Sequence, residues 1–182
     1  MDPPSDYDLA VHARRGDAEA FGELVRRYQT SVFNVCYRMM GNRQEAEDMS
    51  QEAFIRAYSR LATYDTERPF GPWIRRVAAN FCLNRLASKA PINMPLMDEH
   101  GTVHTPHERN LELATETAER ARAIRHAMAD LPPHYLAVIE LRHFQELSYN
   151  EISYTMGISL SQVKSYLFRA RKLLGEALKE HE

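Results

Sequence analysis

The chain has 182 residues with 23 basic and 25 acidic side chains, so its formal net charge of −2 gives no overall sign of nucleic-acid binding. No signal peptide and no run of about 18 apolar residues is seen, which predicts a cytoplasmic protein without membrane insertion. The length allows two small domains, and the only two cysteines, Cys36 and Cys82, lie in apolar helical patterns, so they are expected to be buried thiols rather than a disulfide.

The first two predicted helices are defined by their end signals. One is expected from Asp6 to Arg15, ending at Gly16, and a longer one follows Asp17 and continues to Met40. The longer helix carries an apolar stripe at helical spacing and is stopped by Gly41 and Asn42.

A third helix, predicted from Arg43 to Leu61, carries an unusual row of acids. We call Glu45, Asp48 and Glu52, which follow one another at helical spacing, the acidic row. Like charges one turn apart cost an isolated helix a few tenths of a kcal/mol, so a basic protein partner is one explanation for them. The alternative is that acids in the first turn complement the helix dipole, but this effect falls off within one turn and Glu52 lies beyond it.

The loop from Ala62 to Pro69 leads into a fourth predicted helix that runs to about Ser88, with Ile74, Val77, Phe81 and the stem of Arg85 toward the core. Another side of this helix gathers an aromatic ring, a cation and two amides. We call this set the Trp73 face: Trp73, Arg76, Asn80 and Asn84. With Tyr64 and Phe70 nearby, it offers rings for base stacking, a cation for phosphate and amides for base edges, as single-stranded DNA requires. The alternative is ordinary core aromatics beside a solvated helix face.

Residues 89–104 contain Pro91, Pro95 and Gly101 with little periodicity, which predicts a flexible linker between two domains. Three histidines at 100, 104 and 107 have spacings that would suit a metal, but the nearby proline and glycine argue against one, and no cofactor is expected. A helix starting at Thr105 and carrying Ala121, Ile124 and Met128 in its stripe is predicted to reach Leu131, and a shorter one opens at Pro132-Pro133 and runs to about Phe144.

The stretch 148–174 reads as a helix-turn-helix. Ser148 with Glu151 begins one helix, Gly157 ends it, and Ser159 with Gln162 begins the next. In the second helix, the side chains expected to be buried are Leu160, Val163, Leu167, Ala170 and Leu174. The outward side chains, which we call the recognition face, are Ser161, Gln162, Lys164, Ser165, Tyr166, Phe168, Arg169 and Lys172. This face has no acid and would suit a DNA major groove, although an amphipathic helical hairpin with a solvated basic face fits the same pattern.

Three sequence strings and their order resemble the extracytoplasmic-function (group IV) sigma factors of bacterial RNA polymerase. The strings are EAEDMSQEAF at 45–54, the W-I-x-x-V-A-x-N pattern at 73–80 and the V-K-S-x-L-x-R-A-R pattern at 163–171. The resemblance covers nearly the whole chain. It implies an all-α protein of two small helical domains: a sigma region 2-like domain at 1–88, the linker at 89–104, and a region 4-like domain at 105–182.

The resemblance also implies partners and roles. The region 2-like domain would bind the clamp helices of core RNA polymerase through Glu45, Asp48, Gln51, Glu52 and Phe54. It would hold and melt the minus-ten promoter element with Tyr64, Asp65, Arg68, Phe70, Trp73, Arg76, Asn80 and Asn84. The region 4-like domain would bind the polymerase flap and read the duplex minus-thirty-five element with Ser159 and the recognition face. Asn84 and Tyr166 depart from the commonest family pattern, so the promoter sequence does not transfer.

These features predict an alternative, stress- or signal-responsive sigma factor, held by an anti-sigma factor and without an active site of its own. The runner-up is a helix-turn-helix regulator that binds DNA alone, which should protect a palindrome as a dimer, whereas two different basic faces in one chain predict an asymmetric bipartite site. An enzyme is disfavoured because no nucleophile motif, phosphate loop or credible metal set is found.

Overall fold

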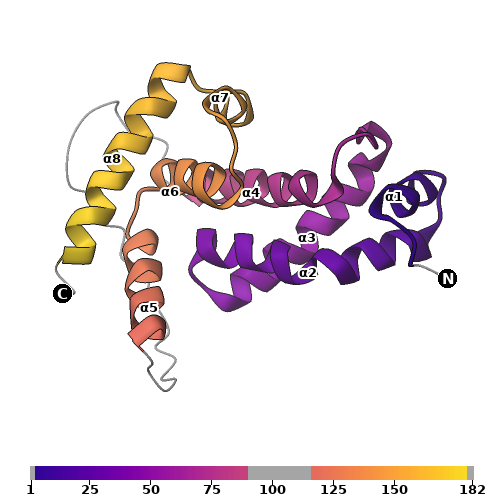
Figure 1. Cartoon of the computed structure of the whole chain (residues 1–182), viewed down its shortest axis with the longest axis horizontal. Helices are drawn as coiled ribbons and strands as arrows, with labels where there is room; N and C mark the ends of the chain where they lie inside the picture. Colours follow the sequence, from indigo (N-terminus) through magenta and orange to yellow (C-terminus); the bar gives the residue numbers. More distant parts are fainter. Residues whose placement is uncertain (1–2, 90–115, 180–182) are drawn as a thin grey trace.

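A computed structural model describes residues 3–89 and 116–179, and within these ranges all regular structure is helical. The N-terminal unit consists of α1 (Asp6–Arg14), α2 (Ala18–Met40), α3 (Arg43–Arg60), the short turn η1 (Leu61–Thr63) and α4 (Phe70–Lys89). The C-terminal unit consists of α5 (Glu116–Ala129), α6 (Pro133–Ile139), the π turn η2 (Glu140–Phe144), α7 (Tyr149–Met156) and α8 (Leu160–Lys179). The predicted all-α fold is confirmed (Figure 1).

The ends of α2 and α3 form where the sequence signals place them. The Asp17 carboxylate accepts a hydrogen bond of 3.1 Å from the Ala20 amide at the start of α2, and Gly41 ends that helix with a φ of 69°. The side chain of Asn42 then accepts a 2.9 Å hydrogen bond from Glu45 and begins α3. One cap was not predicted: a capping box between Ser5 and Asp8 starts α1.

The buried side of α4 differs from the predicted stripe. Ile74 is buried as expected, but Val77 and Phe81 are only half-buried and Arg85 is exposed. The buried apolar residues of this helix are Phe70, Ile74, Ala78, Ala79 and Cys82. The prediction was wrong because α4 contacts α2 and α3 on one side and α6 and η2 on another, so its buried arc is rotated.

Cys36 on α2 and Cys82 on α4 are both completely buried and unbridged, which confirms the prediction of buried thiols. The neighbouring Cys36 thiol and burial together raise the pKa of Cys82 well above its ordinary value. A thiol held protonated in this way is a poor nucleophile.

In the C-terminal unit, α8 packs against α5, α6 and α7. Met128 is buried as predicted, and Leu131 is buried too, whereas Ile124 is 40% exposed, so its predicted burial is wrong. The start predicted at Thr105, the linker beyond Lys89 and the three histidines at 100, 104 and 107 lie outside the described residues. Within 3–89 and 116–179, no helix has the length and apolarity needed to cross a membrane.

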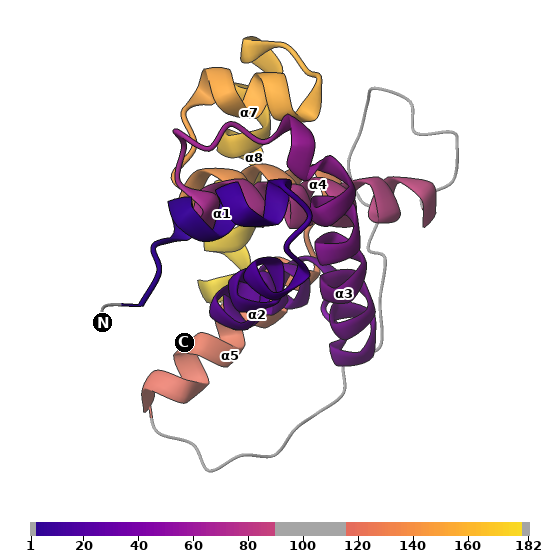
Figure 2. The same ribbon diagram turned by 90° about the vertical axis from the view of Figure 1, so that its right-hand side faces the viewer.

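The two units lie against each other. Helix α4 contacts α6 and η2, and α2 contacts α5, α6 and η2. Figure 2 shows α4 lying between α2 and α7, so the predicted DNA helix of the first unit faces the helix-turn-helix of the second.

Candidate nucleic-acid interface

The predicted helix-turn-helix is present as α7, a tight turn and α8. The Ser148 hydroxyl accepts a hydrogen bond from the Glu151 amide, while the Glu151 carboxylate accepts one of 2.9 Å from the Ser148 amide. The bonds from Ser148 hold the pKa of Glu151 below its usual range. Gly157 ends α7 with a φ of 65°, and Ser159 and Gln162 exchange the same reciprocal bonds at 2.9 and 3.1 Å. Both predicted starts and the stop are therefore confirmed.

Packing between α7 and α8 fixes which side of α8 faces outward. Ile152 from α7 and Val163, Leu167 and Ala170 from α8 are buried, as expected for the last three. Leu160 is 39% exposed, so its predicted burial is wrong: it is the first residue of α8, where few neighbours surround a side chain.

Most of the recognition face is open to solvent. Ser161, Lys164, Phe168, Arg169 and Lys172 are exposed, whereas Gln162 and Ser165 are half-buried. The Phe168 side chain is 71% exposed, so it presents a large apolar surface on this face.

Tyr166 differs from the rest of this face because its ring packs inward. It lies 4.8 Å from the His134 ring and 5.5 Å from the Tyr135 ring, measured between ring centroids. Burial and the nearby Arg169 lower the pKa of His134, so this ring favours its neutral form. Tyr166 therefore supports α8 from α6 rather than standing free to read bases.

The aromatic residues beside the Trp73 face form a cluster. Tyr64 lies 4.6 Å from Trp73 and 5.6 Å from Phe70, and Phe70 lies 5.3 Å from Trp73. Tyr64 and Phe70 are buried, and the Tyr64 hydroxyl donates to the Arg68 carbonyl. Burial raises the pKa of Tyr64 to about 12. The expectation that these two rings stack on bases is wrong for this arrangement, because both are core; the half-buried Trp73 is the ring left at the surface.

The polar members of the Trp73 face are in different environments. The Arg76 guanidinium lies 3.4 Å from the Glu151 carboxylate of α7. Among the described residues, the Arg76 Nε and Asn80 Oδ1 atoms are buried without a hydrogen-bond partner. Asn84 is exposed at the other edge of the face. In the preceding loop, Asp65 and Arg68 form an exposed ion pair of 3.4 Å, so both are at the surface as predicted.

The acidic row lies on α3 beside a shallow groove between α3 and α4. Asp48 and the predicted Gln51 are exposed, Glu45 is half-buried, and Glu52 pairs with Arg56 at 3.1 Å. The groove has a volume of about 500 Å³ and is lined by Asp48, Met49, Glu52, Arg56, Phe81, Asn84, Arg85 and Ser88. It therefore connects the acidic row with the Asn84 end of the Trp73 face.

Three residues of α3 differ from the prediction for the polymerase-binding surface. Phe54, predicted to contact polymerase, is buried in the core. Ile55 and Tyr58 are 63% and 46% exposed, and their spacing from Asp48 and Gln51 places them on the same side of α3. This apolar extension was not predicted, although the helical spacing of positions 48, 51, 55 and 58 indicates it.

Each of the two units matches the model of a known protein family. The family model described as sigma-70 region 2 matches residues 24–91, and that described as sigma-70 region 4 matches residues 121–174. The chain is 33% identical over 174 residues to the ECF RNA polymerase sigma factor SigW of Bacillus subtilis, covering 92% of this chain and 93% of that protein.

Two solved structures share the fold. One is CnrH in complex with the cytosolic domain of CnrY, with a TM-score of 0.63, 24% identity, and coverage of 97% of this chain and 99% of that chain. The other is the sigma factor RpoE of Bartonella quintana in complex with the anti-sigma factor NepR, with a TM-score of 0.59, 16% identity, and coverage of 89% and 98%.

Proposed function

Because the chain belongs to the extracytoplasmic-function sigma factors of the sigma-70 family, we propose that its two units read the two elements of one promoter. The N-terminal unit, from residue 1 to 88, takes the minus-ten element and the C-terminal unit, from 105 to 182, takes the minus-thirty-five element. The observation that carries this proposal is the presence of two different DNA-suited faces, on α4 and on α8, one in each unit.

The recognition face of α8 enters the duplex major groove at the minus-thirty-five element. Ser159, Ser161 and Gln162 lie at the N-terminal end of the helix, where side chains reach base edges. The exposed cations Lys164, Arg169 and Lys172 lie further along and contact phosphates. Tyr166 positions α8 by packing on His134 of α6.

The Trp73 face captures the melted minus-ten strand. Trp73 supplies a ring for stacking, Arg76 a phosphate contact, and Asn80 and Asn84 amides that donate and accept at base edges. The loop residues Asp65 and Arg68 extend this surface. Tyr64 and Phe70 act indirectly, because their buried rings support Trp73.

The acidic row and the exposed apolar side chains beside it bind the clamp helices of core polymerase. Asp48, Gln51 and Glu52 provide the polar contacts, and Ile55 and Tyr58 provide apolar area at the same surface. A mixture of apolar surface and complementary charge suits a specific, dissociable protein interface. The C-terminal unit makes a second contact with the polymerase flap.

The protein acts in the cytoplasm with the polymerase and catalyses no reaction of its own, since polymerase supplies the active site. An anti-sigma factor restrains it until a signal arrives. Support for this partner comes from the fold shared with the NepR-bound RpoE.

Run-off transcription with core polymerase on a genomic library, followed by footprinting of a selected promoter, tests the proposal. We expect transcripts only when both proteins are present, and protection of an asymmetric bipartite site. The isolated chain should bind duplex weakly, because two small basic faces neutralise few phosphates. Tight binding of a palindrome without polymerase would instead identify a regulator that acts alone.

A further inference from the structure

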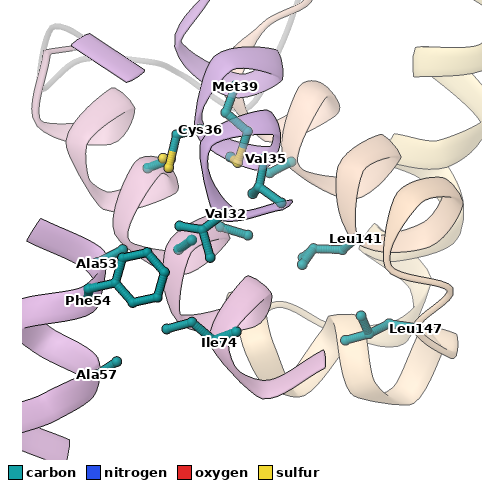
Figure 3. Close-up of a cluster of buried hydrophobic side chains, with 14 of the residues drawn as sticks. Val32, Val35, Cys36, Met39, Ala53, Phe54, Ala57, Ile74, Leu141 and Leu147 are labelled. Carbon is teal, nitrogen blue, oxygen red and sulfur yellow. The ribbon is translucent and has the colours of Figure 1, made fainter. Parts of the chain in front are cut away.

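The two units share one continuous apolar core, although each carries its own DNA face. Val35 and Met39 of α2 and Ile74 of α4 belong to the same buried cluster as Leu141 and Leu147 of the C-terminal unit. Figure 3 shows these side chains in one buried cluster, with Leu141 of the C-terminal unit directed toward Val32 and Val35 of α2. The shared core implies a defined packed arrangement of the two units rather than two independent bodies.

A buried ion pair crosses this contact. The Glu140 carboxylate accepts two hydrogen bonds from the Arg38 guanidinium, 2.8 Å from Nε and 2.9 Å from Nη2. Glu140 is completely buried, and among the described residues it is the one charged side chain in the core. The guanidinium also lies 4.2 Å from the centre of the Phe144 ring. A bidentate pair of this kind has a fixed geometry, so it selects one arrangement of the two units.

The π turn η2 presents the contacting groups of the C-terminal unit. Its wide backbone ring closes where the Gln145 amide donates to the Glu140 carbonyl at 3.1 Å. Glu140 and Phe144 meet Arg38 of α2, and the Gln145 side chain donates to the Arg75 carbonyl of α4 at 3.5 Å. A π turn is rare in α-helical segments and is often found at functional positions. The π turn and the residue after it thus contribute three side chains that contact the other unit.

The contact is not fully satisfied. Among the described residues, three buried polar side-chain atoms have no hydrogen-bond partner, and they belong to Arg76, Asn80 and Gln145. The first two residues lie on α4, and Gln145 follows the π turn that packs against it. Desolvated unpaired atoms oppose the packed arrangement, so the shared apolar core and the Arg38–Glu140 pair have to offset their cost.

The arrangement covers one functional surface and leaves the others open. Glu151 of α7 pairs with Arg76, which occupies the phosphate-binding edge of the Trp73 face. Lys164 and Phe168 of the recognition face remain exposed, as does Asp48 of the acidic row. A chain packed in this way can meet duplex DNA and polymerase but cannot hold a separated strand along the whole Trp73 face.

We propose that the free chain is closed, that the Arg38–Glu140 pair is the latch between the two units, and that opening of this latch exposes the minus-ten surface. Closure itself is independent of any DNA role, whereas its consequence for strand separation rests on the proposed function. The device would separate promoter search, which the closed chain permits, from melting, which requires the open chain.

Single-molecule energy transfer on the full chain tests the latch. Dyes are attached at Ser59→Cys on α3 and Gly175→Cys on α8, both exposed positions, while the buried native thiols remain unlabelled. Arg38→Met leaves the Glu140 carboxylate buried and unpaired, so the open-to-closed ratio should rise by at least about a hundredfold. The double variant Arg38→Met/Glu140→Leu should return toward the closed wild-type distribution, because a well-packed apolar pair can replace a buried ion pair.

Arg26→Met is the matched control, since Arg26 is on the same helix and pairs at 2.9 Å with Glu23 on the exposed side of α2. It should leave the distribution unchanged. An open wild-type chain, or an Arg38→Met variant as closed as the control, would overturn the proposal.

A second measurement tests what the closed form covers. Asn80→Cys should react with maleimide at least about tenfold faster in the Arg38→Met background than in the closed chain, whereas Asn84→Cys, at the exposed edge, should react equally in both. Equal rates at position 80 would show that closure leaves this face accessible. Neither readout uses polymerase or DNA. Loss of transcription with intact closure would therefore contradict the proposed function alone, and an open chain that supports transcription would contradict the latch alone.

Discussion

Replacing Asn80 with alanine is expected to stabilise the fold and to weaken promoter melting. The Asn80 Oδ1 atom is buried without a partner among the described residues, and such an atom costs about 1–3 kcal/mol. Asn80 also lies inside α4, where alanine is favoured by up to about 0.7 kcal/mol. Lost packing of the half-buried amide offsets part of this gain. We expect a net stabilisation of about 0.5–2 kcal/mol, and each kcal/mol corresponds to about 2–4 °C in Tm for a chain of this size.

Although Asn80→Ala should stabilise the fold, it should weaken capture of the melted promoter strand. A lost hydrogen bond to the edge of an unstacked base costs about 0.5–1.5 kcal/mol, which corresponds to roughly 2- to 13-fold weaker capture of the open strand. Permanganate reactivity of a duplex promoter should therefore fall with Asn80→Ala holoenzyme. Activity should largely return on a template already mismatched across the minus-ten element, because strand separation has then been supplied.

Asn84→Ala is the control for stability. Asn84 is exposed, so its replacement should bring only the helix-propensity gain of up to about 0.7 kcal/mol. The difference in Tm between the two variants therefore measures the effect of removing the buried Asn80 Oδ1 atom. A lower Tm for Asn80→Ala, normal duplex melting, or no recovery on the mismatched template would refute the reasoning.

Three further predictions concern other surfaces. Asp48→Lys with Glu52→Lys should abolish co-purification with core polymerase while circular dichroism stays unchanged, since reversal replaces attraction by repulsion at an exposed face; normal binding would remove the acidic row from the interface. Gly71→Ala should lower the free energy of unfolding, measured in urea, by about 1–3 kcal/mol, because the added Cβ would lie 2.7 Å from Cε1 of Tyr28, whose ring packs on Phe70. The control Gly175→Ala adds a Cβ with no atom within 4 Å, so it should raise the free energy of unfolding by up to about 1 kcal/mol. Lys164→Ala should weaken holoenzyme binding on both duplex and mismatched templates and reduce the salt dependence of log K by about one unit, whereas a defect confined to duplex melting would place Lys164 in the wrong step.

The local sequence determined the helix ends and much of the helix-turn-helix. Ser148, Glu151 and Gly157 act within a few residues of one another, as do Asp17 and Asn42 at their own helices. Their hydrogen bonds depend on the backbone immediately beside them, so a cap or a left-handed glycine can be predicted without knowing the rest of the fold. The same is true of the outward cations on α8, whose buried side has clear helical spacing.

Tertiary packing decided which rings are buried and where the two units meet. Tyr64 and Phe70 have the composition of a stacking surface, but their neighbours on α2 and α4 enclose them, and periodicity cannot distinguish those outcomes. The rotated buried side of α4 arises because the C-terminal unit covers part of it. Arg38 and Glu140 are 102 residues apart in the chain and carry no shared motif. Their bond depends on the relative placement of α2 and the π turn, which is a property of the folded protein and not of either segment.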